Sequence, residues 1–242
     1  MKILFLLPPS EGKNKDMEWK SSFSTENLSF KFEKPLNIAC NVTEKDLKCS
    51  WKRFEEWLEF NKILCKDSRS AIPTMKAINR YSWVMFNAID YSWMTNPWKE
   101  FFEQQFLILS GMYGILKPLD TIWNYKLPIE SKWLLDFWED KIIREINKQW
   151  VDYVVNLLPI SYSKLILWKN KKVWEEFNKL RKFWIININF LKLDWKKISH
   201  WVKKIKWEWV KNICEKAIEN YDKFWGEVVD RKEGIIDVNI IG

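Results

Sequence analysis

The sequence predicts a mixed α/β (α+β) fold in which helices cover a mixed β-sheet, and three observations support this expectation. The continuous apolar run at 2–7 and the largely apolar segments at 106–110 and 152–159 predict strands. Strongly amphipathic segments at 132–150 and 199–220 predict helices that can cover such a sheet. Neither an internal repeat nor a Pro/Gly/Ser-rich linker interrupts the chain, so we expect a single compact domain over residues 1–242.

The individual strand segments have different patterns. "KILFLL" (2–7) is almost entirely apolar, which favours a strand that is buried on both faces. "FLILS" (106–110) follows a short helical segment and precedes a glycine-bearing turn and Pro118. "KFWIININFLKLD" (182–194) alternates apolar and polar residues, as a strand with one buried face does. Residues 14–37 are polar and irregular, and we expect an extended loop there.

Apolar residues recur every three or four positions in the predicted helices. Residues 43–66 begin at Thr43, a good N-cap, and predict one or two helices. Residues 73–90 begin at Pro73 and predict a helix that breaks near Ser82. In the helix expected over 132–150, the apolar stripe consists of Leu135, Trp138, Ile142, Ile146 and Trp150.

Charge and hydropathy restrict the class of protein. The formal net charge of +8 favours a polyanionic partner. No apolar run approaches the roughly 20 residues that a membrane-spanning helix requires. Pro8 and Pro9 end the first apolar stretch too early for a signal peptide. We therefore expect a cytoplasmic protein that does not enter a membrane.

The cysteines and the single histidine argue against a metal centre. No C-x-x-C pair is present, and a Cys/His zinc site needs more histidine or closer cysteines than this chain has. We expect neither a metal nor a cofactor. The thiols are interpreted as reduced and partly buried, because free cysteines pack like small apolar residues. They belong to Cys40, Cys49, Cys65 and Cys214.

The motif "PPSEGK" (8–13) directly follows the first predicted strand. Gly12 would let the backbone approach a ligand closely, and Lys13 would place a charge near a phosphate. The motif lacks the P-loop pattern, so an ordinary surface turn is the alternative interpretation. Ser10 and Glu11 complete the candidate cleft residues of this segment.

The segment "LSGMYGILKPLD" (109–120) is more informative, because two glycines directly follow a predicted strand in it. Open α/β sheets bind ligands at the carboxyl ends of their strands. A tight structural turn with ordinary surface charges is the alternative. The candidate residues here and in the following "NYKLPIE" are Ser110, Gly111, Tyr113, Gly114, Lys117, Asp120, Tyr125, Lys126 and Glu130.

A basic amphipathic helix is predicted near the C-terminus, around "ISHWVKKIKWEWVKNI" (198–213). Its lysines either contact phosphates or form an ordinary solvated face. They are Lys203, Lys204, Lys206 and Lys211. Ser199 and His200 are further cleft candidates, although a lone histidine is more often structural. Trp207 lies among the lysines rather than on the apolar stripe, where an aromatic residue is hard to explain.

Motifs in all parts of the chain resemble those of the YaaA family of peroxide stress proteins. They are "LLPPSEGK", "LSGMYGILKPLD" followed by "YKLPIE", "DFWEDKI", "VVNLLPISYSK" and "ISHWVKKIKW", in the family's order, from residue 1 to about 225. The central motif is the most specific, because the family has S-G-L-Y-G-V-L-R-P-L-D there. Met112, Ile115, Lys117 and Lys126 are conservative departures, and the sequence departs more around Ile129–Glu130.

The resemblance implies a cytosolic bacterial protein that limits oxidative damage when hydrogen peroxide accumulates, in part by restraining free iron. It also implies one compact mixed α/β fold with a basic cleft that binds duplex or branched DNA with low sequence specificity. A helix-hairpin-helix-like element is expected within residues 43–80, although its usual glycine-bearing hairpin is not visible there. No catalytic mechanism follows from the resemblance, and we expect a monomer.

Glycine and tryptophan occur in unusual numbers. Average usage would give roughly 17 glycines in a chain of this length, but there are 6 glycines and 18 tryptophans. The family has glycine where Trp83, Trp195 and Trp207 stand, and Trp150 occupies a helix end where a glycine is expected on physical grounds. Our hypothesis is that these four tryptophans are encoded glycines, from UGA codons that the organism reads as glycine. A protein that is truly rich in tryptophan is the alternative.

Three functions are compatible with the sequence. The first is a DNA-binding stress protein, whose phosphate contacts come from Lys13, Lys117, Lys126 and the lysines of 203–211. The second is an enzyme or binder of a nucleotide or phosphorylated small molecule in the central cationic cleft. Its pocket would be lined by Ser10, Glu11, Lys13, Ser110, Tyr113, Lys117, Asp120 and Lys126. The third is a scaffold with an indirect role in stress, and we rank the three in this order.

Overall fold

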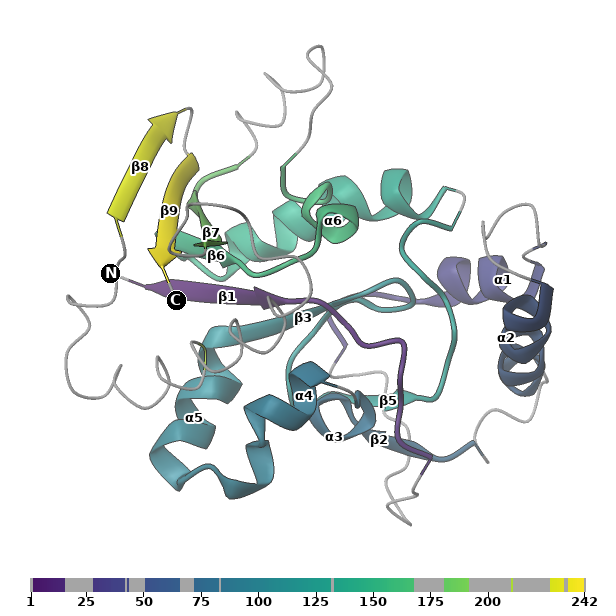
Figure 1. Ribbon diagram of the computed structural model, residues 1–242. Helices are drawn as coiled ribbons and strands as arrows, with labels where there is room; N and C mark the ends of the chain where they lie inside the picture. The colour runs from purple at the N-terminus through teal and green to yellow at the C-terminus, as the bar shows by residue number, and fades with distance from the viewer. Residues whose placement is uncertain are drawn as a thin grey trace.

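A seven-stranded mixed sheet, in the order β4-β3-β1-β6-β7-β9-β8, forms the centre of the fold (Figure 1). The computed structural model describes residues 2–15, 28–41, 43, 51–65, 72–82, 84–131, 133–167, 181–191, 210, 227–232 and 235–241. The strands of this sheet are β1 (Ile3–Leu7), β3 (Phe106–Ser110), β4 (Gly114–Leu116), β6 (Tyr153–Asn156), β7 (Trp184–Leu191), β8 (Glu227–Lys232) and β9 (Ile235–Ile241). The five inner strands run parallel, and β4 and β8 close the edges in antiparallel pairing. The expected mixed α/β fold is therefore confirmed.

Burial explains the apolar runs of the inner strands. All five residues of β1 and all five of β3 are buried, as expected for parallel strands that are covered on both faces. The pairing aligns Leu6 with Leu107 on one side of β1 and Ile3 with Tyr153 on the other. The strands predicted within 2–7, 106–110, 152–159 and 182–194 are all present.

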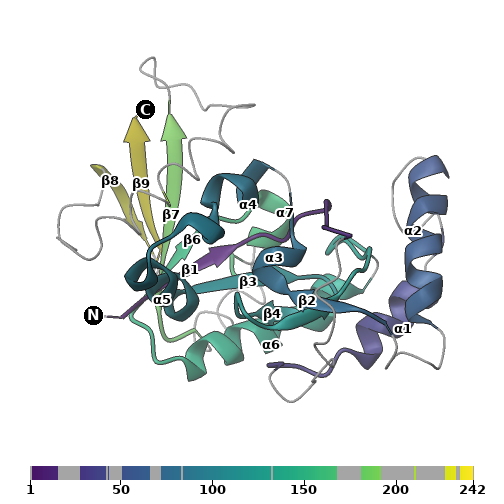
Figure 2. The same cartoon turned by 90° about the horizontal axis from the view of Figure 1, so that it is seen from below.

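Helices cover both faces of the sheet. In Figure 1, α6 (Leu134–Lys148) lies above β1 and β3, and α5 (Asn96–Gln105) lies below them. Figure 2 shows α3 (Ala77–Arg80) and α4 (Val84–Ile89) near α5. The remaining elements are α1 (Glu33–Asn41), α2 (Trp51–Leu64), α7 (Ile160–Ser163) and the 3-10 helix at Tyr91–Trp93. The buried face of α6 includes Trp138, Ile142 and Ile146, as its periodicity predicts. Trp150 was expected on the same stripe, but it lies beyond the end of the helix and is exposed.

Two expectations about secondary structure are wrong. The extended loop expected over 14–37 ends earlier, because α1 begins at Glu33 and buries Leu36 and Ala39 on one face. Residues Thr74–Lys76, expected to start a helix, form strand β2, which pairs in antiparallel fashion with β5 (Thr121–Trp123). The structure of so short a segment depends on its pairing with a distant strand. The periodicity of the local sequence cannot predict that pairing.

The cysteines also depart from the expectation of reduced thiols. Cys40, near the end of α1, and Cys65, directly after α2, form a disulfide. The two helices pack against each other, which brings together residues separated by 25 positions. Closing a loop of this length stabilises the fold by about 3 kcal/mol in the chain-entropy model. Cys49 and Cys214 lie outside the described residues.

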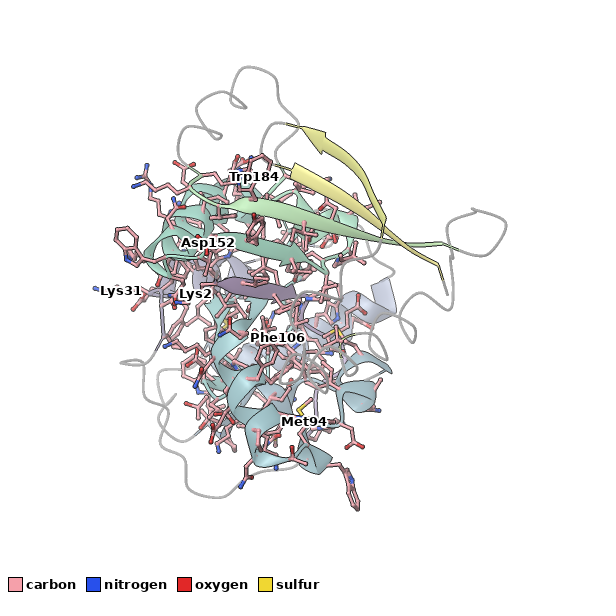
Figure 3. The ribbon with its side chains drawn as sticks, turned by 90° about the vertical axis from the view of Figure 1, so that its left-hand side faces the viewer. Lys2, Lys31, Met94, Phe106, Asp152 and Trp184 are labelled. Atoms are coloured by element: carbon pink, nitrogen blue, oxygen red, sulfur yellow. A yellow bond between two sulfur atoms is a disulfide. The ribbon has the colours of Figure 1, made fainter. Side chains whose placement is uncertain are left out.

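Backbone and side-chain contacts close the amino-terminal edge of the sheet, where Lys2, Asp152 and Trp184 lie on three neighbouring strand starts (Figure 3). The backbone amide of Lys2 donates to the Asp152 carboxylate at 2.7 Å, and the amide of Trp184 donates to the Asp152 carbonyl at 2.9 Å. The Lys2 ammonium donates to the carbonyl of Gln149 at the end of α6. Among the described residues, no helix is long and apolar enough to cross a bilayer.

Candidate functional site

Two neighbouring parallel strands, β1 and β3, deliver polar residues to the same carboxyl edge of the sheet. From Leu7 the chain continues to Lys13, and β3 ends at Ser110. The backbone around Lys13 is bound to the segment that follows α3: Lys13 forms a β-bridge with Tyr81, and the amide of Ser82 donates to the carbonyl of Gly12 at 3.0 Å. The carboxyl edge is where open α/β sheets bind ligands.

The residues that gather here are Lys13, Arg80, Tyr81, Ser110, Tyr125 and Lys126, and we call them the Lys13 site. The Lys13 ammonium lies 4.3 Å from the centre of the Tyr125 ring and 5.2 Å from that of Tyr81. It donates one hydrogen bond, to the carbonyl of Ser10 at 3.1 Å. The half-buried amine therefore lies over two aromatic rings, in the segment that follows β1.

The electrostatic surroundings of Lys13 disfavour its charged form. Burial lowers the pKa of Lys13 well below its usual value, and the neighbouring cations Lys126 and Arg80 lower it further. Glu11 opposes this shift. The lowered pKa raises the fraction of uncharged amine at neutral pH, and only an uncharged amine is nucleophilic.

A chain of hydroxyl groups runs beside the amine. The Tyr125 hydroxyl lies 2.7 Å from that of Tyr81 and 2.7 Å from that of Ser110. The Ser110 hydroxyl also accepts from the amide of Tyr113 at 3.0 Å. Burial raises the pKa of Tyr125 to about 12, and it raises those of Tyr81 and Tyr113 as well. The phenols are thus protonated at neutral pH and can donate or relay a proton.

Lys126 is positioned from outside the sheet, by α2. The buried side chain of Asn61 accepts from the Lys126 amide at 3.1 Å and donates to the Lys126 carbonyl at 2.7 Å. The Lys126 ammonium in turn donates to the carbonyl of Glu11 at 2.5 Å. The segment that carries Tyr125 and Lys126 is therefore fixed relative to the segment that carries Lys13.

Three residues of this region were not among the sequence candidates. Arg80 donates to the Asn14 carbonyl at 2.6 Å and is almost fully buried, although its segment was expected to be an ordinary helix. Tyr81 belongs to the hydroxyl chain. Tyr162 on α7 is buried close enough to Tyr125 for that phenol to contribute to the raised pKa of Tyr162. An arginine and a tyrosine side by side in a largely apolar segment are the sequence signal that could have indicated the first two.

The central glycines and Asp120 have structural roles. The carbonyl of Gly111 accepts from the Trp138 indole at 2.8 Å, and a Cβ at position 111 would lie 2.3 Å from the Leu127 carbonyl oxygen. Gly114 has a φ of 72°. The Asp120 carboxylate accepts from the amide of Lys117 at 2.7 Å, and burial raises the pKa of Asp120 to about 6. These contacts hold the turn closed.

The structure therefore unites only part of the predicted cleft. Ser10, Gly12, Lys13, Ser110, Tyr125 and Lys126 come together, with Glu11 and Tyr113 beside them. Six candidates lie outside the described residues: Ser199, His200, Lys203, Lys204, Lys206 and Lys211. Within the described part of the chain, no group of three or more His, Cys, Asp or Glu side chains could hold a metal ion.

Comparison with known proteins gives a consistent result over nearly the whole chain. A family model described as "Peroxide stress protein YaaA" matches residues 1–227. A UPF0246 protein of Rickettsia conorii is 31% identical over 199 residues, which cover 78% of this chain and 71% of that protein. A UPF0246 protein of Lactobacillus helveticus is 30% identical over 148 residues, covering 56% of this chain and 55% of that protein.

Proposed function

This chain belongs to the YaaA family of peroxide stress proteins, and we propose that it acts by binding a phosphate-bearing small molecule at the Lys13 site. The observation that carries this proposal is the convergence of three cations at one end of the sheet. Lys126 and Arg80 both lie close enough to Lys13 to lower its pKa. Three neighbouring cations on fixed backbone segments repel one another, and a dianionic phosphate would relieve that repulsion.

Burial favours a small ligand over a DNA backbone at this position. Arg80 is 2% exposed, and Lys13 is half-buried with its nitrogen over the rings of Tyr81 and Tyr125. Phosphates of a duplex reach side chains that project from the surface, whereas a nucleotide or phosphorylated metabolite can contact groups that are partly buried. The site therefore supports an enzyme or binder of such a compound.

Binding of ATP, pyrophosphate and inorganic phosphate to the purified protein tests this proposal. Bound ligand should stabilise the wild-type protein by about 2.7 kcal/mol at a concentration of 100 Kd, measured by chemical denaturation. Lys13→Met and Lys126→Met should each weaken binding at least tenfold, because each removes a nitrogen that would donate hydrogen bonds to the phosphate oxygens. Lys141→Met, at an exposed lysine that lies over Phe137 on α6, is the matched control and should bind as the wild type does. Unchanged binding by Lys13→Met would contradict the proposal.

DNA binding is the second function that we propose, and the net charge of +8 favours it. Its contacts would come from exposed Lys117 and from the lysines of 203–211. Replacing Lys203, Lys204 and Lys206 together by alanine should reduce the slope of log K against log salt by roughly 3 for duplex DNA. The same variant should bind phosphate compounds normally. Absence of binding to duplex or branched DNA at low salt would eliminate this function.

We also place the protein in the cytoplasm, as a monomer. Cytosolic thiols are kept reduced in most organisms, so Cys40 and Cys65 should be found as thiols in unstressed cells. Exposure of cells to hydrogen peroxide should then produce the disulfide that the structure shows. Alkylation of thiols at the moment of lysis, followed by mass spectrometry, measures both states. A pair that is fully oxidised before stress would contradict a cytoplasmic location.

A further inference from the structure

We propose that Lys13 is a nucleophile that forms an imine with the carbonyl carbon of a phosphorylated aldehyde or ketone. The phosphate part of this inference rests on the function proposed above, and the reactive amine goes beyond it. The established family membership assigns no chemistry to this lysine. The argument depends on how the amine is held, on what surrounds it and on where protons can move.

The amine is held by short-range contacts. The Lys13 backbone bridges to Tyr81, and the flanking Gly12 and Asn14 exchange backbone hydrogen bonds of 3.0 Å and 2.8 Å with Ser82 and Arg80. The side-chain nitrogen lies over two aromatic rings, 4.3 Å from the centre of Tyr125 and 5.2 Å from that of Tyr81. A nucleophile whose backbone and side chain are both fixed needs little reorganisation before attack.

Its neighbours favour the reactive, uncharged form. Burial and the cations Lys126 and Arg80 all act against a charge on Lys13. Enclosure together with a second nearby cation is a recognised way of activating a lysine for imine formation. An ordinary phosphate-binding lysine would instead be kept charged, as a solvated lysine is. The surroundings of Lys13 thus favour a nucleophilic amine in addition to a site that binds phosphate.

The hydroxyl chain supplies the protons that imine formation requires. The amine lone pair attacks the carbonyl carbon, the C–N bond forms, and the carbonyl oxygen takes a proton from Tyr125. A proton leaves the nitrogen and returns to the hydroxyl chain of Tyr125, Tyr81 and Ser110. The C–O bond then breaks as the oxygen takes a second proton and leaves as water. One amine, one carbonyl and one proton thus yield one protonated imine and one water.

The two neighbouring cations would orient the substrate. Lys126 is fixed through its backbone by Asn61, and Arg80 through its bond to the Asn14 carbonyl. A phosphate held between them would place an attached carbonyl group beside Lys13, since both cations lie close enough to influence that amine. This arrangement selects compounds in which a phosphate and a carbonyl are a few bonds apart.

Reductive trapping on the full-length protein tests the proposal. The probes are pyridoxal 5′-phosphate, a phosphorylated aldehyde, and pyridoxal, its analogue without phosphate. After borohydride reduction, peptide mass spectrometry measures the modified fraction of each lysine. At pH 7 Lys13 should be modified at least tenfold faster than Lys15, which is exposed two residues away. Modification of Lys13 no faster than of Lys15 would overturn the proposal.

Variants separate reaction from binding. Lys13→Arg keeps a cation but removes the nucleophile, so fast labelling should disappear while pyrophosphate still binds. Tyr125→Phe should slow labelling of Lys13 about tenfold, because proton transfer loses its first donor; an unchanged rate would overturn the assigned proton route. Circular dichroism of both variants verifies folding.

Competition by pyrophosphate distinguishes this inference from the function on which it rests. Pyrophosphate should slow labelling of Lys13 by pyridoxal 5′-phosphate. Fast labelling of Lys13 by both probes without any protection would support the nucleophile and refute the phosphate site. Tight binding of pyrophosphate without labelling of Lys13 would support the phosphate site and refute the nucleophile.

Discussion

Two positions with left-handed backbone conformation lie at opposite edges of the sheet, and very different residues occupy them. Gly114 begins β4 beside the carboxyl edge and has a φ of 72°; Trp150 lies between α6 and the start of β6 and has a φ of 52°. A Cβ at position 114 would lie 2.7 Å from the ring of Trp138, so packing excludes any side chain there. The side chain of Trp150 is 84% exposed, and no packing requires it.

An exposed tryptophan with a left-handed backbone conformation also lies at the start of α6. Trp133 precedes the helix with a φ of 67° and is largely exposed. Trp138, in the same helix, is fully buried, and its indole donates to Gly111. Trp138 is therefore required for packing, whereas Trp133 and Trp150 are exposed and have a left-handed backbone conformation that favours glycine. Trp150 was a sequence candidate for an encoded glycine, and its conformation fits that hypothesis. Trp133 is an additional candidate.

The largest effect is expected at the tryptophan that packing requires. Trp138→Ala should lower the free energy of unfolding by about 3–5 kcal/mol, because it leaves a cavity and removes the hydrogen bond to Gly111. Chemical denaturation measures the change. Trp150→Ala keeps the strained backbone and removes an exposed ring, so it should change stability by less than about 0.5 kcal/mol. Equal losses of unfolding free energy in the two variants would contradict the distinction between the buried Trp138 and the exposed Trp150.

Gly114→Ala should have the next largest effect, a loss of about 2–3 kcal/mol from backbone strain and displacement of the Trp138 ring. The new Cβ meets two atoms of that ring and one of Phe30 at 2.7–2.9 Å. In a Trp138→Leu background the loss should be smaller, because the ring atoms are absent. A double-mutant cycle measures this coupling, and additive losses would show that ring contact is not the cause.

Glu139, next to Trp138, should make stability depend on pH. Burial, followed by the nearby carboxylates of Asp140 and Asp136, raises the pKa of this carboxyl from its usual range to about 7. The folded state therefore binds the proton more tightly than the unfolded state, so stability falls as pH rises from about 4.5 through 7. In the Glu139→Gln variant, the free energy of unfolding should decrease by about 1 kcal/mol less between pH 5 and 8 than in the wild type. This value is reduced to account for partial contact of the carboxyl with solvent. An unchanged pH profile would contradict this assignment.

The sequence predicts the inner sheet and α6 well. The buried residues of these elements pack in one core, so their apolar residues recur in the pattern typical of a strand or a helix. Strand β2 is different: three residues acquire their structure only by pairing with β5. The same distinction holds for the Lys13 site. Lys13 and Ser110 follow apolar strands and could be assigned to one edge, whereas Tyr81 reaches that edge through the β-bridge with Lys13. The disulfide was missed for the same reason, since α1 was not expected to exist.

The smallest effect concerns Trp150, and it has the opposite sign. Trp150→Gly should raise the free energy of unfolding by about 0.5–1 kcal/mol, because relief of left-handed strain exceeds the entropy cost of glycine. Trp184→Gly is the matched control: Trp184 is also partly exposed but lies in strand β7, where glycine should destabilise by about 1 kcal/mol.

The codons decide whether the natural protein already has the more stable residue. UGA at positions 133 and 150, with UGG at 138, would mean that the exposed tryptophans are glycines and the buried one is not. UGG at all three would make Trp133 and Trp150 genuine tryptophans with left-handed backbone conformations. Trp83, Trp195 and Trp207 lie outside the described residues, so for them the codon is the deciding observation. If position 207 is glycine, the predicted helix loses the aromatic residue that lies among its lysines, and the phosphate contacts proposed for that face must come from the lysines alone.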